Sequence, residues 1–528
     1  MMLGRGTKAF WRETYFLLMR PVAAGELGEA RACRPDARTP LASGVRERGL
    51  RQHEVPFHMP GHSRGRSVHH TLQELSKGAL SFDTTELEGL DYLAYPSGII
   101  AEAQELASEA FGADRSWFLV NGTTVGIHAA VMSAVREPGD AVVISRDCHQ
   151  SAFSAMILAD AVPVWAEPEY DDDFGFASAS ATKLCEALAG CSRAPAAVLA
   201  VSPNYYGVCA GVRELASCCH SRGVPLLVDE AHGSHFAFHR GFPPTSLSQG
   251  ADLVVQSTHK TLSAMTQASM LHVSGPRVCS DRVTRSLQIL QSSSPSYVLM
   301  SSLDAARAHA SEASDYHHDG EGDRPAGAGE QTFSRTIYAS LEAKDEISRV
   351  PGLRVLRGEG VDPLRLTVGV SGLGQTGFEV SRQLEEEYGV VPELATQASV
   401  VFIVTLGTAS ADLKLLVRAL REVAGQSDGP GRGPPWSQPS GLVLPSCGTQ
   451  AMSPRQAFFA GHARVETSTA VGRVAAEIVC PYPPGIPILY PGEKISEEAL
   501  EFLLAFKREG GYVSGCSDAT LDTLLVVE

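Results

Sequence analysis

The 528-residue chain lacks several features that define common protein classes. It has no segment of the form G-x-x-x-x-G-K-[ST], so the letters DEAH at residues 229–232 do not indicate a helicase, which needs such a phosphate loop. No apolar run approaches the ~20 residues that span a bilayer, and we therefore expect no membrane segment. The 11 cysteines are odd in number, scattered and without C-x-x-C spacing, which indicates reduced thiols.

Positive charge is also scarce. The chain has 44 Lys and Arg against 60 Asp and Glu, which gives a formal net charge of -16. This balance argues against a nucleic-acid partner and suits a cationic small molecule. The length of the chain leaves room for two or three domains with large cores.

Two short apolar runs each end in side chains that can carry chemistry. Residues 225–228 (PLLV) and 253–255 (LVV) are typical of buried parallel strands, and they deliver Asp229 and the group Ser257, His259 and Lys260. Pyridoxal phosphate (PLP) needs a lysine amine to form its Schiff base and a carboxylate to keep its pyridine nitrogen protonated. Lys260 taken alone could equally be a solvated surface lysine. The strand context favours a PLP site built on Asp229 and Lys260.

Two further strand ends predict the rest of the cofactor site. After an expected strand at 117–120, residues 121–126 (NGTTVG) open a helix, whose backbone N–H groups and hydroxyls can bind the PLP phosphate. The same letters are also common in simple helix caps. After a strand at 141–145, His149 is placed to stack on the pyridine ring, although a lone histidine in such a position is often structural.

Six segments add a resemblance to this local pattern. In chain order they are 56–62 (PFHMPGH), 83–87 (DTTEL), 202–207 (SPNYYG), 257–260 (STHK), 302–307 (SLDAAR) and 481–487 (PYPPGIP). The ordered set, over residues 39 to 500, resembles the bacterial-type ornithine/lysine/arginine decarboxylases, which are fold type I PLP enzymes. The chain departs from the family at Ser63 and Gln150, where Lys is common, and at Asp147, where Asn is common. None of these changes removes a group that the chemistry needs.

The resemblance implies a role for each predicted cofactor residue. Lys260 forms the Schiff base, Asp229 pairs with the pyridine nitrogen, and His149 stacks on the ring face opposite Ala231. Ser292 matches a position that reaches the phosphate from the neighbouring subunit, which implies a homodimer or higher oligomer with shared active sites. The remaining predicted cofactor-binding residues are the phosphate ligands Thr123, Thr124, Ser257 and His259, together with His232.

The resemblance also implies the reaction, which is decarboxylation of a basic amino acid for polyamine synthesis. Loss of CO₂ leaves a carbanion that the protonated ring delocalises, and Lys260 or His149 then returns a proton. Arginine is the first expectation because short members of the family are commonly arginine decarboxylases, while lysine and ornithine stay open. The distal cation of the substrate needs a carboxylate. Glu477, Asp83 and Glu86 are the candidates, although each could equally be solvated or structural.

Three other functions fit part of the pattern. A fold type I aminotransferase would share Asp229 and Lys260 and add an arginine from a second domain. A cysteine desulfurase would need a nucleophilic loop cysteine, and none of the 11 lies in a recognisable motif. An inactive regulatory partner of a decarboxylase is disfavoured because both Lys260 and Asp229 are present. The arginines that keep the aminotransferase open are Arg354, Arg357 and Arg365.

The predicted fold class is α/β, fold type I, with a parallel-rich sheet where strands alternate with helices over about residues 115–275. The expected parts are an N-terminal extension (1–38), a PLP-binding large domain (39–310), a low-complexity insert (311–335), a small α/β domain (336–425), a Gly/Pro-rich linker (426–440) and a C-terminal subdomain (441–528). The proline-rich segment 481–487 could hold a rigid wall over the site.

The extension and the first insert allow more than one interpretation. Residues 10–22 are apolar and aromatic between arginines, which is compatible with a transit peptide and a plastid location, but residues 13–36 hold more acid than such peptides usually do. An amphipathic arm on a cytoplasmic protein is the other expectation. The insert carries His317 and His318 among acidic residues. Such charge runs are usually solvated, and we expect no metal site.

Overall fold

The computed structural model describes residues 38–51, 53–314, 332–426, 445, 448–482, 486–508 and 511–528. The chain divides into residues 1–37 and residues 38–528, and the described residues belong to the second unit. The extension on which the transit-peptide alternative rests therefore lies outside the described residues, apart from Arg38. The predicted insert begins inside α11 (Tyr297–Ala313) and ends inside α12 (Phe333–Ser348), and its His317 and His318 lie outside. The predicted linker shares only Gln426 with α14 (Ser410–Gln426).

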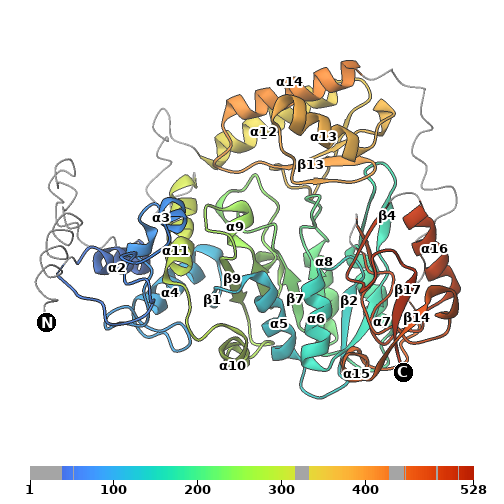
Figure 1. The fold of residues 1–528 in the computed structure, drawn as a ribbon, viewed down its shortest axis with the longest axis horizontal. Helices are drawn as coiled ribbons and strands as arrows, with labels where there is room; N and C mark the ends of the chain where they lie inside the picture. The colour runs from blue at the N-terminus through green and yellow to red at the C-terminus, as the bar shows by residue number, and fades with distance from the viewer. Residues whose placement is uncertain are drawn as a thin grey trace, which may run out of the picture. The chain divides into compact units, whose positions relative to one another are not determined.

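A seven-stranded sheet forms the centre of residues 115–273 (Figure 1). Its strands lie in the order β1 (Arg115–Leu119), β9 (Ser269–Val273), β8 (Leu253–Gln256), β7 (Leu226–Asp229), β6 (Ala197–Val201), β2 (Ala141–Ser145) and β3 (Val162–Ala166). The pairings from β8 through β7, β6 and β2 to β3 are parallel. The α/β class and the parallel-rich sheet are thus confirmed.

Strand β9 is the exception, because it runs antiparallel to both of its neighbours, β8 and β1. A parallel connection needs a crossover long enough to carry the chain back along the sheet, usually through a helix. The helix between β8 and β9 is α9 (Thr258–Thr261), a single turn of four residues. The chain therefore turns back instead of crossing over.

Helices cover both faces of this sheet, which explains why its strands are apolar on both sides. One face packs against α5 (Gly122–Ala134), α6 (Gln150–Ala159) and α10 (Ser280–Leu290). The other packs against α7 (Ala181–Gly190) and α8 (Val212–Ser221). Since parallel strands bring their carboxyl ends to one edge, the residues that follow β2, β7 and β8 meet there.

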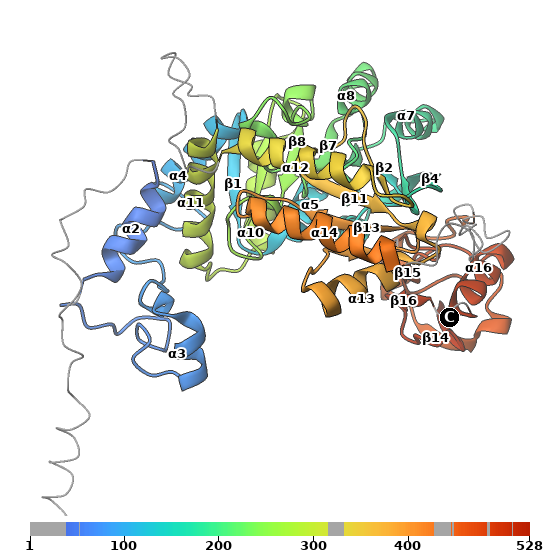
Figure 2. The same cartoon turned by 90° about the horizontal axis from the view of Figure 1, so that it is seen from above.

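The segment before β1 contains α2 (Pro40–Gly49), α3 (His70–Ser76) and α4 (Ile99–Phe111). α2 packs on α4 and α11, and Asp304 of α11 accepts hydrogen bonds from the backbone of Leu41 and Ala42. Figure 2 shows α3 to the side of the seven-stranded sheet.

A second, antiparallel sheet follows α12, in the order β10 (Arg354–Val355), β11 (Arg365–Gly369), β13 (Ser399–Ile403) and β12 (Leu394–Ala395). Helices α12, α13 (Gly377–Tyr388) and α14 accompany it.

The last part contains α15 (Pro454–Phe459), the pair β14 (His462–Glu466) and β17 (Thr523–Val527), the pair β15 (Cys480–Tyr482) and β16 (Tyr512–Ser514), and α16 (Glu497–Arg508). A small hairpin of β4 (Glu169–Asp171) and β5 (Phe176–Ser178) lies between β3 and α7. Arg146, just after β2, joins this last part to the large sheet through a buried ion pair with Glu493.

Candidate active site

A cavity of about 200 Å³ opens at the carboxyl ends of the parallel strands. It brings together every predicted cofactor residue except Ser292. These residues are Thr123, Thr124, His149, Asp229, Ala231, His232, Ser257, His259 and Lys260. Segments that are far apart in the sequence therefore form one site, as the strand order requires.

Lys260 lies in α9, directly after β8. Its Nζ is 3.1 Å from Nε2 of His232 and 5.3 Å from the ring centre of Tyr205. Burial lowers the pKa of the Lys260 amine; nearby Arg365 lowers it further, and Asp229 and Glu393 oppose the shift. A lysine in such a place has more of the neutral amine that a nucleophile needs.

Asp229 ends β7 and is buried, and its Oδ1 accepts a hydrogen bond from the N–H of Ala231 at 3.1 Å. Burial raises the pKa of this carboxyl, against the opposing effect of His149 and Lys260. A buried carboxylate is stabilised by a cation at hydrogen-bond distance. A protonated pyridine nitrogen is such a partner, so the environment of Asp229 fits PLP.

A group of hydroxyls surrounds the start of α5. Gly122 opens the helix with a φ of 76°, and Thr123 Oγ1 contacts Ser257 Oγ and lies 3.1 Å from Ser269 Oγ. Gly126 lets α5 approach the sheet, since a Cβ there would lie 2.4 Å from Val255 Cγ1. Hydroxyls together with a helix N-terminus suit a phosphate. Ser269 was missed from the sequence, because only the pairing of β9 with β1 brings it here.

His149 caps α6, and its Nδ1 accepts a hydrogen bond from the N–H of Ser151 at 3.2 Å. Its proton is therefore on Nε2 when the ring is neutral. Burial lowers the pKa of His149, and Lys260 adds to this effect while Asp229 opposes it. The ring of His149 lines the same cavity as Asp229.

Glu477, the first candidate for the distal cation, does not line the cavity. Its Oε2 accepts from the N–H of Ser517 at 2.6 Å and its Oε1 from that of Leu525 at 2.7 Å. Two backbone amides account for this buried carboxylate without any substrate. The structure therefore does not support the prediction that Glu477 binds substrate.

Asp83, Glu86 and Ser292 also lie outside the cavity of their own chain. Asp83 Oδ2 is 3.1 Å from Nε2 of His62, and Glu86 accepts from the hydroxyl of Thr85. Ser292 is exposed and donates its N–H to Asn121 Oδ1 at 3.1 Å. Within one chain these residues are not assembled with Lys260.

A second cavity of about 280 Å³ adjoins the first, and Asp147, His149, Tyr205 and Tyr206 line both. Asp147 accepts from the hydroxyl of Ser145 and, at 3.3 Å, from the N–H of Ala179. Burial raises the pKa of Asp147, and within the described residues no cation pairs with it. The tyrosines and Asp147 were not among the predicted site residues.

The arginines that kept an aminotransferase open occupy different places. Arg354 and Arg357 are exposed and paired with Asp173 and Asp345. Arg365 is buried and donates from Nη2 to Nδ1 of His232 at 3.1 Å. The desulfurase alternative finds no support, since burial raises the pKa of Cys480, beside the second cavity, to about 12.

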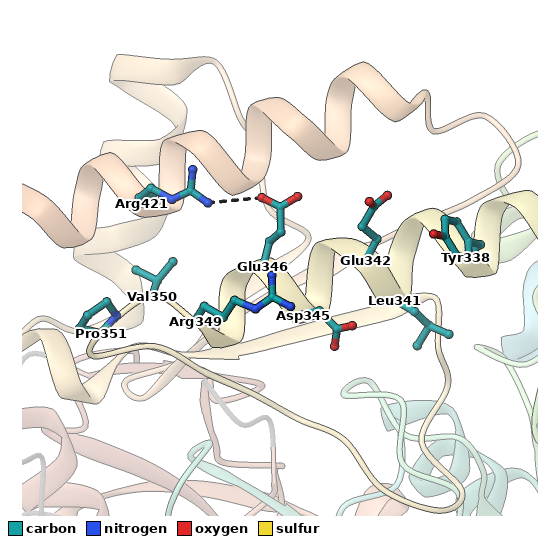
Figure 3. Close-up of a pocket in the computed structure, with 9 residues that line it drawn as sticks. All are labelled: Tyr338, Leu341, Glu342, Asp345, Glu346, Arg349, Val350, Pro351 and Arg421. Carbon is teal, nitrogen blue, oxygen red and sulfur yellow. Dashed lines mark hydrogen bonds and ion pairs between the residues drawn. The ribbon is translucent and has the colours of Figure 1, made fainter.

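A larger hollow, of about 730 Å³, lies between α12 and α14, away from these residues (Figure 3). Charged side chains surround it, including the exposed pair Arg421 and Glu346, which are 3.3 Å apart. None of the predicted cofactor residues lines this hollow. In the described part of the chain, no cluster of His, Cys, Asp and Glu is arranged to hold a metal ion, and no helix is long and apolar enough to cross a bilayer.

Two regions of the chain match the Orn/Lys/Arg decarboxylase family, residues 39–349 its major domain and residues 443–516 its C-terminal domain. An arginine decarboxylase of Halalkalibacterium halodurans is 36% identical over 499 residues, which cover 93% of this chain and 98% of the relative. One of Bacillus subtilis is 35% identical over 501 residues, with 93% and 98% covered. These relatives are bacterial and give no support to a plastid location.

The crystal structure of a lysine decarboxylase from Francisella novicida has the same fold, with a TM-score of 0.75 at 21% identity, covering 94% of this chain and 82% of that one. The resemblance carried by the six segments is therefore confirmed. The chain belongs to the Orn/Lys/Arg decarboxylase family and is a decarboxylase.

Proposed function

We propose that this enzyme decarboxylates arginine with PLP held by Lys260. The observation that carries the proposal is that Lys260, Asp229 and His149 face one cavity, with the carboxylate Asp147 at its border with a second. Bound PLP supplies the electron sink that loss of CO₂ from an unactivated amino acid requires. The names of the relatives from Halalkalibacterium halodurans and Bacillus subtilis favour arginine as the substrate.

Each protein group has a separate task in this proposal. Asp229 keeps the proton on the pyridine nitrogen, and the hydroxyls of Thr123 and Ser257 hold the phosphate with His259, whose Nδ1 donates to the carbonyl of Ala268 at 2.9 Å. His149 covers one face of the ring. His149, with its proton on Nε2, is the group that would return a proton to Cα.

The second cavity takes the side chain of the substrate. A guanidinium entering it meets Asp147, a carboxylate where the family commonly has Asn, and no lysine, because Gln150 stands where the family commonly has one. The cavity is thus more negative than the family pattern would make it. Loss of the charge-assisted contact between the guanidinium and Asp147 should cost on the order of 2 kcal/mol, or roughly thirtyfold in kcat/KM.

We propose further that two copies share their sites. Large apolar side chains are exposed on the segment before α4, including Phe57, which is 97% exposed, and Leu75 and Tyr95. A monomer rarely leaves such a group in water. A second copy covering this segment would bring Asp83, Glu86 and Ser292 toward its partner's cavity. Dilution should then lower specific activity and PLP occupancy together, and full activity in a demonstrated monomer would refute sharing.

The test of the reaction is CO₂ release from arginine, lysine and ornithine in parallel, with added PLP. We expect arginine to give the highest kcat/KM. Lys260→Ala should lose both turnover and the visible band of the lysine-bound cofactor, and a band that borohydride fixes to another lysine would refute the assignment.

Asp147→Asn should reduce kcat/KM for arginine while leaving that band intact, with the exposed Asp172→Asn as the matched control. An unchanged kcat/KM would move the cation site to Asp83 or Glu86.

A further inference from the structure

His232 lies between two basic side chains. Its Nε2 is 3.1 Å from Nζ of Lys260, and its Nδ1 is 3.1 Å from Nη2 of Arg365. His232 is 3% exposed and Arg365 1%. Water is therefore excluded from this chain of contacts at His232 and Arg365.

The direction of both hydrogen bonds follows from the chemistry of the three groups. A guanidinium only donates, so Nδ1 of His232 must accept from Arg365. The imidazole is then neutral with its proton on Nε2, and Nε2 must donate to Lys260. An ammonium has no lone pair with which to accept this bond. Lys260 can complete the chain only as a neutral amine.

The position of Arg365 makes this arrangement fixed. Its stem passes against Gly207, where a Cβ would lie 2.6 Å from Arg365 Cβ. Its Nε and Nη1 are buried and, within the described residues, have no hydrogen-bond partner. Asp362, the buried carboxylate nearby, is 3.1 Å from Nε2 of His235. Among the described residues, this buried guanidinium makes its side-chain hydrogen bond to His232.

We propose that Arg365, acting through His232, holds the amine of Lys260 in its neutral form. Arg365 is then a positioning residue for the cofactor lysine, and the proposal rests on that role of Lys260. The charged and titratable groups that face Lys260 come from several elements. They are Asp229 of β7, Arg365 of β11, Glu393 before β12, His149 at α6, His259 of α9, His232 and Tyr205.

The directions of the pKa shifts agree with this geometry. Burial lowers the pKa of His232 well below its ordinary value, and Arg365 and Lys260 add to the effect. The neutral form of the ring, which this shift favours, is the one that can accept from Arg365 through Nδ1. The Lys260 pKa is lowered in the same direction, as described above.

A neutral amine matters at two points of the cycle. When PLP is loaded, the lone pair of Nζ attacks the aldehyde carbon, a C=N bond forms, and the aldehyde oxygen leaves as water with the two amine protons. After turnover, the released Lys260 must again be neutral to displace the amine product. An ammonium can do neither.

The test uses the full-length protein freed of PLP. The rate at which the visible band appears after mixing with PLP is followed from about pH 6 to 9, a range in which the neutral fraction of an ordinary lysine falls about tenfold for each unit by which the pH is lowered. In wild type we expect only a shallow dependence on pH. In Arg365→Met and His232→Phe the rate near pH 6.5, expressed relative to the same variant's rate near pH 9, should be at least about tenfold lower than in wild type, because Lys260 regains its proton.

Two conservative variants separate this role from a structural one. In His232→Gln the amide oxygen can accept from Arg365 and the amide nitrogen can donate to Lys260, and Arg365→Lys keeps a donor-only cation. Both should retain most of the wild-type profile. A structural role predicts instead a loss that is equal at every pH, and this result would overturn the proposal, as would identical profiles in wild type, Arg365→Met and His232→Phe.

A second readout needs no cofactor. Brief acetylation of the PLP-free protein, followed by peptide mass spectrometry, compares the reactivity of Lys260 with that of the exposed Lys414 across the same pH range. We expect the ratio to rise as pH falls in wild type and to be flat in Arg365→Met. A flat ratio in wild type would refute the inference. Loss of the band in Lys260→Ala would meanwhile leave the proposed function standing, so the two failures are distinguishable.

Discussion

The buried ion pair of Arg146 and Glu493 can be used to test what fixes residues 486–495 to the large sheet. Arg146 Nη1 is 2.6 Å from Glu493 Oε1 and Nη2 is 2.8 Å from Oε2. The same guanidinium donates to the carbonyls of Pro487 and Ile488 at 2.9 and 3.1 Å, and it lies 4.5 Å from the ring centre of Trp165. The side chains are 6% and 1% exposed.

Arg146→Met should strongly destabilise this region, because it leaves the Glu493 carboxylate buried and unpaired. Breaking one side of a buried pair costs roughly 3–5 kcal/mol, whereas replacing both sides with apolar residues is often close to neutral. The double variant Arg146→Met/Glu493→Leu should therefore recover most of the loss. The two single effects would then fail to add, as expected for groups in direct contact.

Hydrogen exchange of residues 486–495 measures this effect without requiring the whole chain to unfold in one step. A loss of about 3 kcal/mol corresponds to exchange roughly a hundredfold faster in that segment. Arg354→Met is the matched control, since its pair with Asp173 is 64% exposed on both sides and should matter by less than about 1 kcal/mol. The reasoning would be refuted if hydrogen exchange in Arg146→Met were as slow as in the control. It would also be refuted if the effects of the two single substitutions simply added in the double variant.

Three further outcomes follow from single side chains. Asp229→Asn should retain PLP but lose about 10³-fold in turnover, or ~4 kcal/mol of barrier, and near-normal turnover would contradict its pairing with the pyridine nitrogen. Glu477→Gln should speed hydrogen exchange around Ser517 and Leu525 while leaving KM for arginine unchanged; a higher KM with unchanged exchange would restore its substrate role. Burial raises the pKa of Glu230 to about 7, so the folded state binds this proton more tightly than the unfolded chain, and stability should fall as pH rises from about 4.5 to 7. Glu230→Gln should flatten that fall in urea unfolding, and an unchanged slope would contradict it.

The cofactor residues predicted from the sequence line one cavity because they lie next to strands. Asp229 follows an apolar run and Lys260 follows another, and parallel strands must bring such ends to one edge. The same logic placed His149 and Thr123. Each of these predictions needed only a local pattern of about ten residues and the general topology of α/β sheets.

Predictions that depended on distant contacts were less secure. Glu477 was chosen because it stands shortly before the proline-rich segment, but its partners, Ser517 and Leu525, lie 40 and 48 residues further along the chain. The antiparallel β9 was missed for a related reason. Its direction depends on how far α9 can carry the chain, and helix length is the least reliable part of a prediction from sequence.

The protonation of Lys260 could not have been predicted from any motif. His232 belongs to the DEAH letters, but the residue that fixes its tautomer, Arg365, lies 133 residues away on β11. The contact exists because Gly207 leaves no Cβ in the path of the Arg365 stem. The lysine and its acidic partner therefore come from one sheet, whereas the charge that keeps the amine neutral comes from another. The lysine can therefore be recognised from the sequence around it, whereas its protonation state depends on how the two sheets pack against each other.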